Sequence, residues 1–167
     1  MPVELFSERL CLREPVPSDD EALTALNADP EVMEFIEKGG RSAQQAADFL
    51  VRIRKQWSEL GFGFLVVRER GSERIIGGAG LLVRAPGGPA DVGYFLERAS
   101  WGKGYATELA ARLLRWAFED LGRDQVFALV APGNFASLRV LEKLGMTFDA
   151  TVDKGTLRYR VWRDGPK

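Results

Sequence analysis

The stretch Trp101-Gly102-Lys103-Gly104-Tyr105-Ala106-Thr107-Glu108 decides how the rest of this sequence is interpreted. Two glycines, one residue apart, lie between a predicted strand at residues 91–96 and a predicted amphipathic helix. The first N–H groups of a helix lack partners within the helix, and the helix dipole adds partial positive charge there. Because glycine lets a ligand approach the backbone closely, this stretch predicts a site for an anion such as a diphosphate.

The two better-known glycine-rich phosphate motifs do not fit this stretch. Thr107 stands where the third glycine of the G-x-G-x-x-G dinucleotide fingerprint belongs. A Walker A loop would need Gly-Lys-Ser/Thr after a longer glycine spacing. Gly-x-Gly alone is common in ordinary turns, so the position between strand and helix is what favours an anion site.

Outward from this turn, the pattern of apolar residues predicts an α/β (α+β) domain. Capping patterns at Ser18 with Glu21 and at Ser42 with Gln45 predict two helices upstream, the second ending at Gly61. Strands are expected at 9–14, 62–70, 75–83, 91–96, 125–130, 147–152 and 156–162. The order predicts a mixed, mostly antiparallel, seven-stranded sheet flanked by about four helices, in a single domain spanning residues 1–167.

Composition excludes several classes of function. The chain of 167 residues has a formal net charge of −1, so we expect no nucleic-acid partner. It lacks a stretch long enough to span a membrane and a recognisable signal peptide, and its single cysteine fits a reducing, cytoplasmic environment. The chain has no histidine, which excludes Ser-His-Asp catalysis and histidine-bearing zinc sites, and we expect no metal.

A second motif, Asn134-Phe135-Ala136-Ser137, is followed by Leu141-Glu142-Lys143-Leu144-Gly145-Met146. Alone it predicts a helix capped by Asn134 and stopped by Gly145. Together with the glycine turn it resembles the GNAT acetyltransferase superfamily, in particular the branch of ribosomal-protein N-terminal acetyltransferases that modify alanine and serine termini. The opening Arg9-Leu10-x-Leu12-Arg13 and the closing Arg158-Tyr159-Arg160 also match that branch.

The resemblance implies acetyl-coenzyme A as cosubstrate. Its diphosphate would be held by Gly102, Lys103, Gly104, Tyr105, Ala106 and Thr107, although Lys103 alone could equally be a solvated surface residue. The strand at Phe95 and Leu96 would separate from the strand ending at Val130, and the pantetheine arm would lie between them. A main-chain N–H near Leu96 would polarise the thioester carbonyl. Asn134 would hydrogen-bond the arm or the backbone beside it.

The same resemblance implies an N-acetyltransferase in which a primary amine attacks the thioester directly. Many superfamily members have a tyrosine seven residues after the asparagine as general acid, and here that position is Leu141. Ser137 matches the serine that the closer branch has instead, and would donate to the departing thiolate; otherwise it only completes the helix start. Asp91 is the candidate general base, with a plain turn residue as the alternative.

Several points stay open at this level. The acceptor is either a protein N-terminus or a small-molecule amine, and the chain is either a monomer or a homodimer. The alternative function is a non-catalytic acyl-coenzyme A-binding or sensor module of the same fold, because the missing tyrosine and the uncertain base leave room for it.

Overall fold

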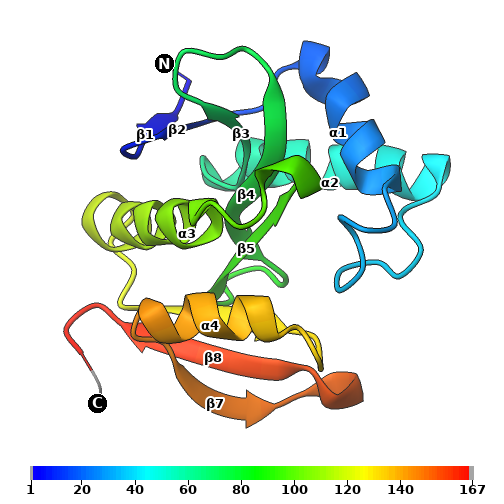
Figure 1. The fold of residues 1–167 in the computed structure, drawn as a ribbon. Helices are drawn as coiled ribbons and strands as arrows, with labels where there is room; N and C mark the ends of the chain where they lie inside the picture. The colour runs from blue at the N-terminus through cyan, green and yellow to red at the C-terminus, as the bar shows by residue number, and fades with distance from the viewer. Residues whose placement is uncertain (1, 166–167) are drawn as a thin grey trace.

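The computed structural model describes residues 2–165, which form an eight-stranded mixed sheet with helices on both faces (Figure 1). The strand order is β1-β2-β3-β4-β5-β6-β8-β7. The strands are β1 (Glu4–Phe6), β2 (Leu10–Arg13), β3 (Phe64–Glu69), β4 (Ile75–Val83), β5 (Ala90–Leu96), β6 (Gln125–Val130), β7 (Thr147–Thr151) and β8 (Leu157–Trp162). The helices are α1 (Asp20–Ala28), α2 (Ala43–Leu60), α3 (Tyr105–Arg115) and α4 (Phe135–Lys143).

The prediction of seven strands was wrong by one, and the additional strand is β1. It has three residues and pairs antiparallel with β2 at the edge of the sheet. Only Leu5 of the three is buried. A single inward residue gives no alternation to detect, so the pattern that finds the longer strands could not find this one.

Two layers of apolar side chains cover the sheet, one on each face. The first cluster joins α3 and α4 to one face, through residues such as Leu109, Leu113 and Leu141. The second joins α1 and α2 to the other face, where Leu23 and Phe49 pack against the inner strands. Because side chains alternate along a strand, Leu65 of β3 belongs to the first cluster and its neighbours Phe64 and Val66 belong to the second.

The glycines of β4 are required by close packing, as their density in the sequence suggests. A Cβ added at Gly78 would lie 1.9 Å from Cζ of Phe64, and one at Gly77 would lie 2.2 Å from the carbonyl oxygen of Phe95. The Phe64 ring therefore occupies the space that a side chain at position 78 would need. β4 and β5 are consequently held in a close, unbroken antiparallel ladder from Gly77↔Leu96 to Val83↔Ala90.

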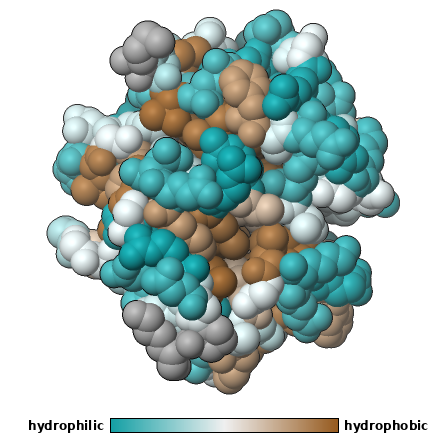
Figure 2. Space-filling view, turned by 90° about the vertical axis from the view of Figure 1, so that its left-hand side faces the viewer, coloured by the Kyte–Doolittle hydropathy of each residue, from teal (hydrophilic) through white to brown (hydrophobic). Residues whose placement is uncertain are grey.

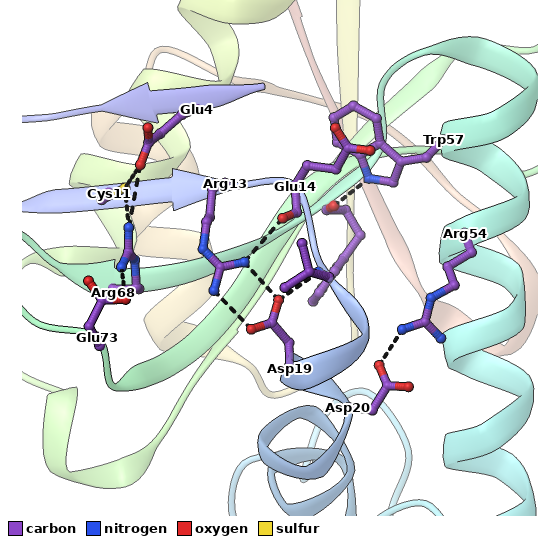
Figure 3. Close-up of polar contacts among 12 residues, drawn as sticks. Glu4, Cys11, Arg13, Glu14, Asp19, Asp20, Arg54, Trp57, Arg68 and Glu73 are labelled. Carbon is purple, nitrogen blue, oxygen red and sulfur yellow. Dashed lines mark hydrogen bonds and ion pairs between the residues drawn. The ribbon is translucent and has the colours of Figure 1, made fainter. Parts of the chain in front are cut away.

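The helix starts confirm one capping prediction and correct another. Ser42 accepts a hydrogen bond from the Gln45 N–H at 3.2 Å and the Gln45 side chain reaches back, the capping box expected for α2. Ser18 does not cap α1, because it lies inside a short 3-10 turn, Pro17–Asp19, that precedes the helix. Asp19 instead forms two hydrogen bonds with the guanidinium of Arg13, at 2.7 and 2.9 Å, which tie this turn to β2 (Figure 3).

Candidate active site

Within residues 2–165, the pairing between neighbouring strands is least complete between β5 and β6. These parallel strands have a single paired position, Asp91↔Phe127, and no further register beyond it. On its other edge β5 remains paired with β4 as far as Leu96. The two strands therefore separate after Asp91, which confirms the predicted splay.

Strand geometry decides which main-chain groups face this gap. Glu97 donates its N–H to the Ile76 carbonyl of the β4 side at 2.8 Å. Successive residues of an antiparallel strand direct their main-chain N–H and C=O groups to opposite edges of the strand. Phe95, like Glu97, therefore directs these groups to β4, whereas Tyr94 and Leu96 direct theirs to the gap. The Phe95 ring packs in the core against Phe64, with ring centroids 5.7 Å apart. The structure thus brings Leu96 to the gap and turns Phe95 away from it, and Tyr94 takes the place expected of Phe95.

The indole of Trp101 is hydrogen-bonded to the main-chain carbonyl of the last residue of β5. Its Nε1–H donates to the Leu96 oxygen at 2.9 Å. Trp101 is otherwise half exposed, with the guanidinium of Arg98 5.5 Å from its ring centroid. This contact ties the start of the glycine turn to the strand before it.

The glycine turn has the backbone conformation that only glycine adopts easily. Gly102 has φ +76° and Gly104 has φ +81°, and Gly104 is the N-cap of α3. The first main-chain bond of the helix is from the Glu108 N–H to the Gly104 oxygen, at 3.1 Å. The N–H groups of Tyr105, Ala106 and Thr107 therefore have no partner within the helix, which is the arrangement expected of an anion site.

Basic side chains surround this turn and are held by carboxylates. Arg9, at the β1–β2 connection, donates to the Lys103 carbonyl at 2.8 Å and forms an ion pair with Glu108 at 2.7 Å. Its Nη2 lies 3.4 Å from where a Cβ on Gly104 would be. The Lys103 ammonium lies 3.9 Å from Glu69, which also accepts the Tyr105 hydroxyl at 2.9 Å. Two cations are thus close to the turn, and the Tyr105 side chain is structural.

Glu108 is the anchor of this arrangement. It accepts hydrogen bonds from the Ser7 hydroxyl and the Arg9 N–H, both at 2.6 Å, besides the Arg9 guanidinium. Partial burial alone would raise the pKa of the carboxyl, but these hydrogen bonds outweigh it and the pKa of Glu108 lies below its ordinary value. The carboxylate form is therefore the one that holds the turn.

The second motif lies across the gap from β5. Asn134 caps α4 by accepting the Ser137 N–H at 3.2 Å, as predicted. The Ser137 hydroxyl lies 3.1 Å from the Tyr94 hydroxyl of β5. Burial raises the pKa of Tyr94 above its ordinary value, so the phenol stays protonated at neutral pH. The expected site residue Ser137 is thus joined to Tyr94 of β5 across the gap.

The other two positions considered for acid–base chemistry lie as follows. Asp91 is almost fully buried and its carboxylate is 2.5 Å from Nε of Arg84. Leu141, which stands at the tyrosine position of other superfamily members, is 2% exposed and belongs to the core. The structure therefore puts an ion pair where a general base was expected and a core residue where the tyrosine would be.

A hollow at the other end of α3 is separate from the anion site. It has a volume of about 380 Å³ and is lined by residues that include Ala111, Leu114, Phe118 and Leu144. Ala111 and Leu114 belong to the C-terminal half of α3, Phe118 to the segment after it, and Leu144 to the end of α4. The hollow is thus at the end of α3 opposite to the glycine turn. The face shown in Figure 2 carries apolar side chains at the bottom of a hollow with hydrophilic side chains around it.

The residues that the structure describes offer neither a metal-binding cluster nor a membrane-spanning helix. Residues 2–165 contain no group of three or more histidine, cysteine or acidic side chains arranged to hold a metal ion. Within the same residues, every helix is too short or too polar to cross a membrane.

Comparisons with known proteins agree with this geometry. A family model described as an acetyltransferase (GNAT) domain matches residues 9–147. The chain therefore belongs to the GNAT acetyltransferase family. The uncharacterized N-acetyltransferase p20 of Bacillus licheniformis is 29% identical over 160 residues, which cover 92% of this chain and 90% of that protein.

Solved structures share the whole fold. An acetyltransferase from Agrobacterium tumefaciens str. C58 has a TM-score of 0.86 at 27% identity, covering 96% of this chain and 95% of that one. A Vibrio cholerae protein assigned as a ribosomal-protein-serine acetyltransferase has a TM-score of 0.77 at 18% identity, covering 96% and 97%. Spermidine N-acetyltransferase from Vibrio cholerae, in complex with CoA and spermine, has a TM-score of 0.79 at 19% identity, covering 93% and 96%. The class of protein defined by this fold and these relatives is an N-acetyltransferase.

Three residues near the site were not assigned a role from the sequence. Arg9 was noted only as part of the opening motif, although it holds the glycine turn. Tyr94 stands two residues before Leu96, so strand alternation alone could have placed both at the same edge. Arg84 carried no comparable signal, because its partner Asp91 is seven residues away and only the β4–β5 connection brings the two together.

Proposed function

We propose that the protein transfers the acetyl group of acetyl-coenzyme A to a primary amine, which attacks the thioester carbonyl directly. The separation of β5 from β6, next to the open N–H groups at the start of α3, is the observation that carries this proposal. The CoA complex of the Vibrio cholerae spermidine enzyme, which has the same fold, supports the choice of cosubstrate. The single, buried cysteine fits a reducing compartment, and we place the reaction in the cytoplasm.

Different groups of the chain would bind different parts of acetyl-coenzyme A. The N–H groups of Tyr105, Ala106 and Thr107 would hold the diphosphate, together with the positive charges of Lys103 and Arg9. Open space around Gly102 supports the fit, because a Cβ there would meet nothing within 4 Å. The outward N–H of Leu96 or of Tyr94 would donate to the thioester carbonyl, a contact of the kind often worth about 3 kcal/mol of barrier. Asn134 would lie beside the pantetheine arm.

Ser137 is the residue we propose as general acid to the departing thiolate. A thiol has an ordinary pKa of about 8.5, so its thiolate needs only modest help and a hydroxyl donor is sufficient. The Tyr94 hydroxyl would hydrogen-bond Ser137 while the proton moves. On the amine side, Asp91 must give up its contact with Arg84 before it can accept a proton. An α-amine with a pKa of about 8 is already partly neutral, so we expect Asp91 to contribute less than Ser137.

The test is thiol release from acetyl-coenzyme A with a panel of peptides and small amines. Ser137→Ala should lower kcat about 10- to 100-fold and leave the Kd of coenzyme A unchanged. The α4 cap survives this change, because it uses the Ser137 N–H and the Asn134 side chain. Tyr94→Phe keeps the ring and removes only the hydroxyl, and should lower kcat by about threefold to tenfold.

The outcomes separate the candidate functions. Tight binding of acetyl-coenzyme A without turnover of any amine would support the non-catalytic sensor module instead. Equal rates for Ser137→Ala and the parent would remove Ser137 from the acid role.

A further inference from the structure

The face of the sheet opposite α4 carries a cluster of arginines beside the gap. In the β6–β8 ladder, Phe127 is paired with Arg160 and Leu129 with Arg158, so these four side chains share one face. The residues between them on β6 and β8 face the α3–α4 core instead. We name the cluster of Phe127, Arg158, Arg160 and Asp149 the arginine face.

The two guanidinium groups are held in defined positions. Arg158 and Arg160 lie over the Phe127 ring, with Cζ atoms 5.2 and 5.8 Å from its centroid. Asp149 bridges them, accepting from Nε of Arg158 at 2.7 Å and lying 3.2 Å from an Nη atom of Arg160. Within residues 2–165, neither Nη group of Arg158 has another hydrogen-bond partner. A planar pair of donors is thus held in place and is open to an oxygen ligand.

Charge on this side of the sheet favours an anion. Strands β5 to β8 carry two carboxylates, Asp149 and Asp91, and Asp91 is paired with Arg84. Three arginines therefore face two carboxylates, leaving one positive charge in excess. Arg158 and Arg160 are each about one third exposed, so a ligand can reach them.

The position of this face relates it to the gap. Phe127 is the residue of β6 that pairs with Asp91, immediately before β5 and β6 separate. α4, with Ser137 at its start, covers the opposite side of the sheet (Figure 1). An amine that approaches a thioester held in the gap must therefore come from the side of Phe127, because α4 closes the other.

We propose that the amine acceptor carries a carboxylate, which the fork of Arg158 binds with help from Arg160. This inference rests on the proposed acetyl transfer, and it names the acceptor as an amino acid or a peptide with an acidic group close to its amine. Arginine forks bind carboxylates through two parallel N–H···O bonds, which gives orientation as well as affinity. A polyamine carries only positive charge and would be repelled by the same face.

The experiment compares acceptors that differ only in the carboxylate. Alanine and alaninamide form one pair, and the dipeptides Ser-Asp and Ser-Asn form the other, so that the two pairs distinguish a free amino acid from an acidic peptide. We expect kcat/KM at least 10-fold higher for the carboxylate member of one pair, with spermidine a poor acceptor. Arg158→Gln should raise the acceptor KM about 10- to 100-fold for that member alone and leave the KM of acetyl-coenzyme A unchanged.

Controls separate binding from folding. Arg158→Lys keeps the charge without the fork and should recover only part of the lost affinity. Arg115→Gln removes an exposed arginine at the far end of α3 and should change neither KM. A merely structural role for Arg158 would lower Tm and leave the carboxylate preference intact, which would overturn the proposal.

A second measurement tests the arginine face without turnover. In calorimetry with coenzyme A present, N-acetylalanine should bind at least 10-fold more tightly than N-acetylalaninamide, and Arg158→Gln should abolish the difference. Equal binding of the two by the parent protein would overturn the inference. Efficient acetylation of spermidine and alaninamide, with no preference for carboxylates, would do the same while leaving the proposed acetyl transfer in place. Absence of turnover with every amine would contradict only the proposed function.

Discussion

The strands on either side of the gap pair with their own neighbours along most of their length, whereas the two strands that border the gap hardly pair with each other. β4 and β5 pair over seven positions and β6 and β8 over six, whereas β5 and β6 share one. β5 and β6 are therefore each fully paired on one edge and almost unpaired on the edge that faces the gap. Because buried main-chain groups need partners, the two unfinished edges are where this fold can accept a chain-like ligand. The site is therefore made by the absence of strand pairing at the boundary between β5 and β6.

A side chain in the glycine turn, which follows β5, should weaken ligand binding more than any other change considered below. Gly104→Val should weaken coenzyme A binding by about 100-fold or more, because a side chain at φ +81° strains the turn and occupies the space before the helix N–H groups. Calorimetry with coenzyme A measures it. Gly122→Val, at φ +64° with nothing within 4 Å, imposes similar backbone strain away from the site and should leave the affinity unchanged. A parental Kd in Gly104→Val would show that the diphosphate lies elsewhere.

The next effect compares a glycine of β4, a strand paired on both sides, with a glycine of β5, the strand that borders the gap. Gly78→Ala should lower the free energy of unfolding by about 3 kcal/mol or more, because its Cβ would overlap the Phe64 ring. Gly93→Ala on β5 meets only Leu82 at 3.6 Å and should cost less than about 0.5 kcal/mol. Urea unfolding of both variants gives the difference. Similar losses in the two would mean that β4 is no more tightly packed at Gly78 than β5 is at Gly93.

The smallest effect concerns the contact that holds the turn to β1 and β2. The pKa of Glu108 is below its ordinary value, so its stabilisation is complete above about pH 4.3, where the unfolded chain is ionised, and is lost as pH falls through the folded-state pKa. Glu108→Gln should lower stability at pH 7 by about 1 kcal/mol, after solvent screening, and flatten the acid limb of the Tm-versus-pH curve. Glu119→Gln, from an exposed pair with Arg115, should leave that limb as steep as in the parent.

Prediction from the sequence succeeded where a local rule fixes the structure. The Ser42 and Asn134 caps, the end of α2 at Gly61 and the glycine turn each depend on residues close together in the chain. It failed where the deciding partner is distant or the signal is short. Ser18 does not cap α1, because it lies in the 3-10 turn that the pairing of Asp19 with Arg13 holds to β2. β1 is too short to show the alternation of apolar residues that marks a strand.

The site followed the same division. The N–H groups at the start of α3 and the position of Ser137 could be predicted, because each follows from a helix start. The pairing of Tyr94 with Ser137 joins residues 43 positions apart, and Arg9 lies 94 positions from the carbonyl of Lys103 that it binds. Contacts over such separations depend on how the strands are ordered in the sheet, which the spacing of residues within one motif does not contain.

The contact between Trp101 and Leu96 also gives the open edge a polarity. Because the Leu96 carbonyl already accepts a hydrogen bond from the Trp101 indole, this end of β5 can offer a ligand the Leu96 N–H as a donor but not the carbonyl as a free acceptor. We therefore expect an amide-containing ligand that lies along β5 to place an oxygen at this position, which favours one of its two possible directions. Trp101, a side chain outside the strand, would thus determine the direction in which a flexible ligand lies along β5.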